Sequence, residues 1–229
     1  MNKKNILTAA VSLSLVACLS IGATLAYFTD QTENAENVFT TGKIDITLID
    51  ETENSNGWKT GVKGDDGITY EEVMPGDILS KRVGFSTAEG ASDAYVALKV
   101  NVNVKSMPNA TATVNEDTLR DELMEQIRDQ VDLRNEFTEL WSESPTLAAD
   151  GSMVFYFNSK VPGGTNNMLL FDHINAPATW GNEYADVEFT IDVQAFAVQA
   201  ANLTAPTEEG STAVEQLNEL IAKVPMPLG

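Results

Sequence analysis

The side chains best suited to metal and acid–base chemistry are scarce in this sequence. His173 is the only histidine, and it stands in the run Phe171-Asp172-His173-Ile174-Asn175. A single histidine excludes the His-Glu-x-x-His motif of zinc peptidases, a three-histidine site, and two histidines with a carboxylate. A Ser-His-Asp triad would need His173, but the chain has no Gly-x-Ser-x-Gly sequence. We therefore interpret His173 as a strand-end or loop residue and expect no catalytic residue and no metal site.

Carboxylates, in contrast, are abundant, with 34 Asp and Glu residues. Glycosidases need two carboxylates at a defined separation, and the sequence distinguishes no such pair. Two acidic runs, Asp50-Glu51-Thr52-Glu53-Asn54 and Gly64-Asp65-Asp66-Gly67, offer oxygen ligands of the kind that Ca²⁺ prefers. Neither run follows the twelve-residue EF-hand spacing, so we expect solvated turns and no bound cofactor.

The N-terminus has the features of an export signal. Lys3 and Lys4 precede an uncharged, largely apolar stretch that continues to residue 29. Thr24 and Ala26 are small residues at the −3 and −1 positions of a signal-peptidase site, which predicts cleavage between Ala26 and Tyr27. Two alternatives stay open. An uncleaved stretch of roughly 20 apolar residues can span a bilayer, and Leu15-Val16-Ala17-Cys18 has the form of a lipobox with a lipidated cysteine.

Cleavage would leave a strongly acidic chain without cysteine. Cys18 is the only cysteine, so the mature chain can form neither a disulfide nor a thiolate zinc site. The full chain has 14 Lys and Arg against 34 Asp and Glu, and residues 1–26 contain two lysines and no acid. The mature net charge is therefore 12 minus 34, or −22. Nucleic acid and anionic membranes would repel such a chain, so we expect neither as a partner, and membrane contact only during export.

Apolar and polar residues alternate in several segments, as half-buried antiparallel strands require. The clearest segments are 44–48, 96–104, 153–157 and 187–193. Two such sheets packed face to face make a β-sandwich. Trp58 and Trp180 stand in polar sequence, and we favour a role for both as caps at the sandwich ends over stacking on a sugar.

Two segments have a helical period instead. Asn115 is a suitable N-cap for a helix over about 116–133. A second helix is expected to begin near Ser211, with Thr212 and Glu215 fitting a capping box. In the first helix an apolar stripe at a spacing of four is expected to face the core. The residues of this stripe are Leu119, Leu123, Ile127 and Val131.

Five short segments follow one another in an order known from one family of exported proteins. They are Gly22-Ala23-Thr24-Leu25-Ala26-Tyr27-Phe28-Thr29-Asp30, Asn37-Val38-Phe39-Thr40-Thr41-Gly42-Lys43-Ile44-Asp45-Ile46, Val73-Met74-Pro75-Gly76-Asp77, Asp93-Ala94-Tyr95-Val96 and Ala195-Phe196-Ala197-Val198-Gln199-Ala200. Together they resemble the camelysin/TasA family of Gram-positive bacteria, whose signals are removed by the signal peptidase SipW. In this resemblance Pro75, Gly76 and Asp77 form the family's turn before the second strand.

The resemblance implies a mainly β fold, a jelly-roll-like antiparallel β-sandwich with one inserted helix and a C-terminal helix. It implies a signal peptide over 1–26, a single domain over 27–229, and secretion to the extracellular matrix or cell surface. Similar proteins assemble into biofilm fibres, where the segment freed by cleavage adds as a strand to a neighbouring subunit. Here the donor would run from Tyr27 to Phe39, with Tyr27, Phe28, Val38 and Phe39 as apolar residues. The partners would be further copies or related fibre proteins, and SipW during export.

Other interpretations of the same features stay open. Residues 27–39 are interpreted alternatively as a flexible tail, and the protein as a monomeric surface binding module. Camelysin is described as a metalloendopeptidase, although this chain lacks the zinc motif. Phe39 is expected to plug the core at a sheet end, and Gly42 to permit close backbone approach or a bulge at the entry of the first strand.

Overall fold

The computed structural model describes residues 38–224, except 42, 54–55, 65–66 and 144. The expected signal, its cleavage site and most of the expected donor, including Tyr27 and Phe28, lie outside the described residues, as does Gly42. The strands are β1 (Val38–Thr41), β2 (Ile46–Glu51), β3 (Val62–Gly64), β4 (Gly67–Glu71), β5 (Ile78–Thr87), β6 (Ala94–Ser106), β7 (Thr146–Leu147), β8 (Met153–Tyr156), β9 (Met168–Asn175) and β10 (Glu188–Gln199). The helices are α2 (Glu116–Thr138), the short 3-10 helix η1 (Asn182–Tyr184) and α3 (Thr212–Ala222).

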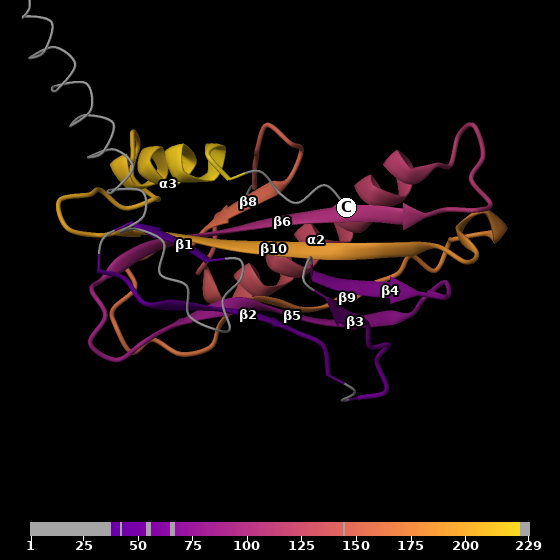
Figure 1. Ribbon diagram of the computed structural model, residues 1–229, viewed down its shortest axis with the longest axis horizontal. Helices are drawn as coiled ribbons and strands as arrows, with labels where there is room; N and C mark the ends of the chain where they lie inside the picture. Colours follow the sequence, from indigo (N-terminus) through magenta and orange to yellow (C-terminus); the bar gives the residue numbers. More distant parts are fainter. Residues whose placement is uncertain (1–37, 42, 54–55, 65–66, 144, 225–229) are drawn as a thin grey trace, which may run out of the picture.

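The strands form two sheets, and in Figure 1 the long strands β6 and β10 of the larger sheet lie above β2 and β5 of the smaller one. The larger has the order β3-β4-β10-β6-β8-β7, with β1 also paired to β10, and the smaller has the order β2-β5-β9. Among the described strands all these pairings are antiparallel except that of β1 with β10. The prediction of a mainly β fold with antiparallel sheets and two helices is confirmed.

The hydrophobic core lies between the two sheets. Alternate residues of β6 and β10 face the smaller sheet, as the period of two predicts. Fully buried members of the core include Leu98, Val100, Phe189 and Val193 from the larger sheet and Val83, Phe85, Phe171 and Ile174 from the smaller one. Because members of both sheets belong to one apolar cluster, burial of this surface holds the layers together.

Helix α2 is inserted between β6 and β7 and packs against β6 of the larger sheet and β9 of the smaller one. Asn115 caps it as predicted, since the Asn115 side chain accepts hydrogen bonds from the backbone N–H groups of Asp117 and Thr118. The predicted stripe Leu119, Leu123, Ile127 and Val131 is fully buried.

The end of α2 was predicted too early. The helix continues past 133 to Thr138, where Glu139 takes the left-handed conformation with φ of 50°. The apolar stripe ends at Val131, but the buried Asn135 keeps the last turns in place. Its side-chain amide donates to the carbonyl oxygen of Trp141 and accepts from the Trp141 N–H. The end of α2 is therefore held by the hydrogen bonds of a polar side chain, whereas the sequence pattern predicts that an apolar side chain would hold it.

Helix α3 covers the outer face of the larger sheet, where it packs against β10 and β6. Its Leu217 and Ile221 join Phe196 and Val198 in a second apolar cluster. The expected capping box of Thr212 and Glu215 is wrong: Ser211 is the N-cap, and its hydroxyl accepts from the Val214 N–H at 3.2 Å. Thr212 exchanges backbone-to-hydroxyl hydrogen bonds with Thr204 instead, which fixes the loop before the helix. Among the described helices, none is long and apolar enough to cross a bilayer.

Candidate functional site

Strand β1 begins eleven residues after the expected cleavage point and lies at an edge of the larger sheet. Its register on β10 is parallel, with Val38 beside Ala195 and Thr41 beside Val198. Strand β6 occupies the whole of the opposite edge of β10, so β1 and β4 share the remaining edge. A parallel neighbour is unusual in this antiparallel sheet, and from β1 the chain passes to β2 of the smaller sheet.

Val38 and Phe39, the two described residues of the expected donor, point to opposite faces of the larger sheet. Val38 packs against the core between the sheets, whereas Phe39 packs against the outer cluster. The Phe39 ring stacks on Phe196 with 5.1 Å between centroids. The expectation that Phe39 plugs the core at a sheet end is therefore wrong, because the alternation of β1 places Val38 inward and Phe39 outward. All four β1 residues are half-buried.

The turn of Pro75, Gly76 and Asp77 lies directly before β5. The Asp77 N–H donates to the Met74 carbonyl at 3.0 Å, and Gly76 has φ of +82°. Proline at the second position and a left-handed glycine at the third are what a type II turn requires. The Asp77 carboxylate also accepts from the Met74 N–H at 2.8 Å. These three residues determine where β5 begins. Strand β5 belongs to the smaller sheet, whereas β1 belongs to the larger one.

His173 lies in β9, two residues before the end of the strand. Its Nδ1 is 2.6 Å from Asp172 Oδ1, and its ring lies 4.7 Å from the Trp58 ring, centroid to centroid. Arg134 of α2 donates to the other Asp172 oxygen at 3.3 Å. A surface hollow of about 450 Å³ lies here between α2 and β9, and Phe137 on its rim is exposed.

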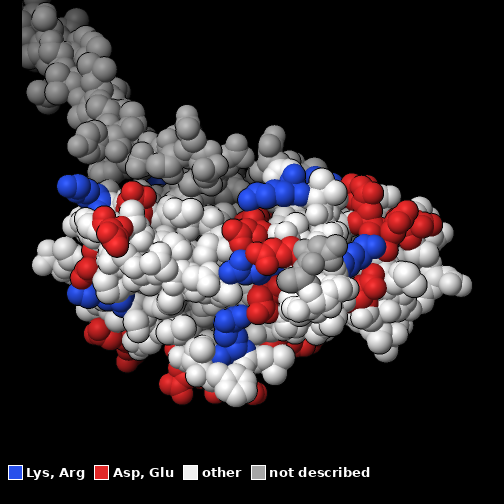
Figure 2. Space-filling view, turned by 90° about the horizontal axis from the view of Figure 1, so that it is seen from below, with Lys and Arg blue, Asp and Glu red and all other residues white. Residues whose placement is uncertain are grey.

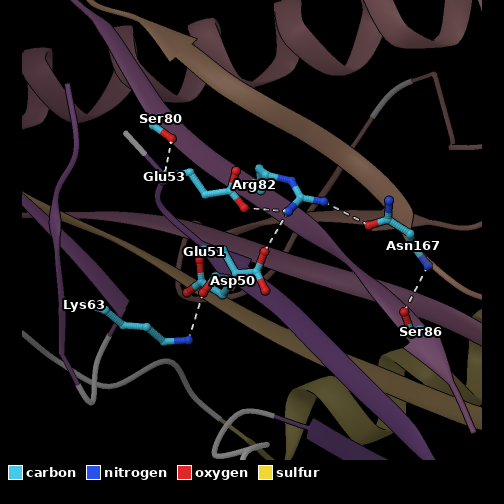
Figure 3. Close-up of polar contacts among 8 residues, drawn as sticks. All are labelled: Asp50, Glu51, Glu53, Lys63, Ser80, Arg82, Ser86 and Asn167. Atoms are coloured by element: carbon cyan, nitrogen blue, oxygen red, sulfur yellow. Dashed lines mark hydrogen bonds and ion pairs between the residues drawn. The ribbon is translucent and has the colours of Figure 1, made fainter. Parts of the chain in front are cut away.

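The acidic run that begins at Asp50 is held by cations of the protein itself. Figure 3 shows Arg82 of β5 between Glu51 and Glu53 on one side and Asn167 on the other. The distances from Arg82 Nη1 are 2.8 Å to Glu51 and 3.2 Å to Glu53. The second acidic run, around residues 65–66, lies outside the described residues. Acidic and basic side chains also interleave on the face seen from below in Figure 2.

The two tryptophans differ in their surroundings. Trp180 is buried and stacks on Tyr184 at 4.7 Å, while its Nε1 donates to Glu122 of α2 at 2.7 Å. Trp180 thus closes one side of the core next to the helix. Trp58 is only half-buried, and it leaves part of its ring available beside His173.

The comparison with known families gives a match over most of the chain. The family model described as camelysin metallo-endopeptidase matches residues 2–160. The chain belongs to the camelysin family. The match runs from the N-terminal segment through β8. It confirms the resemblance to this family that the order of the short sequence segments indicated. Neither a curated protein nor a solved structure matched the chain significantly.

The family's description implies a metal ion, and the residues of this camelysin-family chain do not fit one. Catalytic zinc needs three protein ligands, usually with histidine among them, but His173 is the only histidine. Within the part of the chain that the structure describes, no group of three or more His, Cys, Asp or Glu residues is placed to hold a metal ion.

Proposed function

We propose that this camelysin-family protein is an exported structural subunit of the extracellular matrix or cell surface of a Gram-positive bacterium. Copies of the chain associate when β1 of one subunit leaves its own β10 and pairs with β10 of the next. The observation that carries this proposal is the position of β1, a four-residue, half-buried edge strand close behind the expected cleavage site.

The energetics favour exchange of β1 over exchange of β6, the long strand on the other edge of β10. Strand β10 pairs with β6 over twelve residues but with β1 over only four. Withdrawal of β1 would break few contacts and would expose the backbone of residues 195–198 together with the ring of Phe196. Unpaired backbone groups at a sheet edge accept a strand from another chain. Because the same residues return to the same positions, exchange conserves the contacts and adds a link between subunits.

A monomeric binding module is the second candidate. The hollow between α2 and β9 favours it, because the half-buried Trp58 and the exposed Phe137 offer apolar surface beside Asp172 and His173. In that case residues 27–37 would be dispensable, and ligand binding would depend on Trp58. We infer no catalytic activity for either candidate.

A cysteine-pairing experiment separates the two candidates. The mature chain has no cysteine, so Thr40→Cys in one preparation and Ala197→Cys in another can be mixed under mild oxidation. These two positions are register partners, and neighbouring strands lie close enough for a disulfide. Strand exchange predicts a covalent dimer of the two chains. Mass spectrometry of the exported protein should also show a chain that starts at Tyr27.

The matched control mixes Thr40→Cys with Thr47→Cys, an exposed position of β2 that is no partner of β1. This mixture should give no covalent dimer. If the chain carrying both Thr40→Cys and Ala197→Cys forms only an internal disulfide, and the mixture of single variants gives no dimer, β1 does not exchange. Electron microscopy of the chain with and without residues 27–39 then shows whether fibres arise by any other contact.

A further inference from the structure

A lysine and an aspartate are enclosed together at one end of the core. Lys81 Nζ of β5 lies 2.5 Å from Asp50 Oδ1 of β2, and their side chains are 0% and 7% exposed. The Lys81 ammonium group also donates to the backbone carbonyl of Ile191 in β10, at 2.8 Å. Figure 3 shows Lys63 beside Asp50, with its Nζ donating to the Asp50 backbone carbonyl.

The burial of this pair is costly if it remains ionic. Lysine and aspartate are almost never fully buried without a partner, and their mutual attraction often fails to offset the lost hydration. The surroundings are closely packed: Tyr70, which is fully buried, donates its hydroxyl to the Ser80 carbonyl next to Lys81. Burial lowers the pKa of Lys81, against the opposing effect of Asp50. Enclosure therefore shifts the protonation equilibrium of Lys81 toward the neutral, nucleophilic amine.

A second carboxylate is close to the same amine. Asp192 of β10 is 2% exposed and interacts electrostatically with Lys81. It also accepts a hydrogen bond from Asn103 of β6, which fixes its position on the larger sheet. Three strands thus bring an amine, a carboxyl group that can react with it, and a further carboxylate that can carry a proton.

We propose that Lys81 and Asp50 join in an intramolecular isopeptide bond, with Asp192 as the proton carrier. The uncharged Nζ attacks Asp50 Cγ after one proton has passed from the ammonium group to the Asp50 carboxylate. The new N–C bond forms, one C–O bond breaks, and the oxygen leaves as water with two of the three original ammonium protons. Asp192 accepts a proton from the attacking nitrogen and delivers it to the departing oxygen. The ion pair and its net charge of zero become a neutral amide and water, and no other reactant is needed.

The bond would fix the edge of the smaller sheet. It joins β2, an edge strand, to the central β5, and it closes a loop between two residues whose numbers differ by 31. This loop contains β3 and β4, which pair with the larger sheet. A covalent closure there restricts the unfolded chain and resists separation of β2.

A second lysine–aspartate pair of the protein serves as the internal control. Lys99 Nζ lies 2.6 Å from Asp150 Oδ2, nearly the same distance, but the Asp150 side chain is 31% exposed. Water therefore reaches its carboxylate, in contrast to the enclosed Asp50. We expect Lys99 and Asp150 to remain unlinked in the same sample.

Mass spectrometry of the mature protein, residues 27–229, tests the bond directly. The intact denatured chain should weigh less than its sequence by one water molecule. Trypsin should release residues 44–59 covalently attached to residues 64–82, because these fragments contain Asp50 and Lys81. A mass equal to that of the sequence, with the two fragments separate, would overturn the proposal. A linked fragment that contains Lys99 would show that proximity alone suffices, and would overturn the role assigned to enclosure.

Two variants test the assigned roles. Asp50→Ala should retain the full sequence mass. Asp192→Asn keeps the size of the side chain and its acceptor oxygen, and it should slow the loss of water by about a hundredfold or more, in line with the usual contribution of a general acid or base. Circular dichroism of freshly purified Asp192→Asn should match that of the parent chain. If this folded variant loses water as fast as the parent, Asp192 is not the proton carrier.

Discussion

At the scale of the residue, one carboxylate joins α2 to the segment before β10. Glu122 accepts the Trp180 Nε1–H at 2.7 Å and the Tyr184 hydroxyl at 2.9 Å, one on each carboxylate oxygen. The two rings stack almost in parallel. Charge-assisted hydrogen bonds are stronger than neutral ones, so Glu122 holds both aromatic side chains in their packed positions. The sequence predicted that Trp180 caps the structure but gave no indication of this acceptor.

This arrangement predicts a loss of stability at high pH. Burial, with the hydrogen bond to Glu122, raises the pKa of Tyr184 from 10.0 to about 12. A group whose pKa is raised on folding contributes stability that is fully present below its pKa in the unfolded chain. This stability is lost as the pH rises through its pKa in the folded chain. We expect the free energy of unfolding to fall between pH 10 and about 12, and to fall less in Tyr184→Phe.

Urea titrations of the parent chain and of Tyr184→Phe at either end of that window measure the difference. Burial also raises the pKa of Tyr70, but Tyr70 contributes equally to both chains and cancels in the comparison. An equal loss in the two chains would show that Tyr184 ionises as freely in the folded protein as in the unfolded one.

At the scale of the element, α2 begins where its first backbone N–H groups find an acceptor. Asn115 Oδ1 accepts from Asp117 N at 3.1 Å and from Thr118 N at 3.2 Å, while the Thr118 hydroxyl accepts from the Asn115 N–H. Acidic Glu116 and Asp117 in the first turn add to this favourable start. Local chemistry therefore sets the beginning of the helix, whereas its end depends on the contact of Asn135 with Trp141.

The N-cap predicts that the free energy of unfolding depends on the side-chain acceptor oxygen at position 115. Asn115→Ala should lower the free energy of unfolding by about 1 kcal/mol, the usual cost of losing an N-cap side chain. The control, Asn115→Asp, keeps a good cap and should stay within a few tenths of a kcal/mol of the parent. Chemical denaturation followed by circular dichroism measures both. Equal midpoints for the Ala variant and the parent would mean that packing alone holds the first turn.

At the scale of the whole molecule, association of subunits has to overcome the electrostatic repulsion between chains of the same charge. The mature chain, 12 basic against 34 acidic residues, carries a net charge of −22. Many of the acids pair locally, as Glu51 and Glu53 do with Arg82, but the excess remains. The range of this repulsion is about 30 Å at 0.01 M salt and about 10 Å at 0.1 M.

We therefore expect self-association to increase with ionic strength. Light scattering of the mature protein should show faster growth of assemblies near 0.1 M than near 0.01 M sodium chloride, because the shorter range lets subunits approach. The chain that lacks residues 27–39 should show no such growth at either concentration. Assembly that slows with added salt would indicate contacts between opposite charges in place of strand exchange.

Features that depend on neighbours along the chain could be predicted from the amino-acid sequence. The alternation in 96–104 and 187–193 fixed the inward faces of β6 and β10, and Asn115 with its stripe fixed the start and buried face of α2. The lone His173 was enough to exclude the zinc motif of peptidases. These patterns are local, because side-chain direction repeats every two residues in a strand and every 3.6 in a helix.

The contacts between residues far apart in the sequence depend on the packing of the whole fold. The parallel pairing of β1 with β10 joins Val38 to Ala195, and nothing near either residue encodes the choice. Lys81 lies in Ser80-Lys81-Arg82, where polar residues predict exposure. A register shift of β5 against β9 between Ser80 and Val83 accompanies its burial beside Asp50 and the Ile191 carbonyl, 110 residues away. Contacts over such separations arise from the packing of the two sheets as a whole, which no local pattern records.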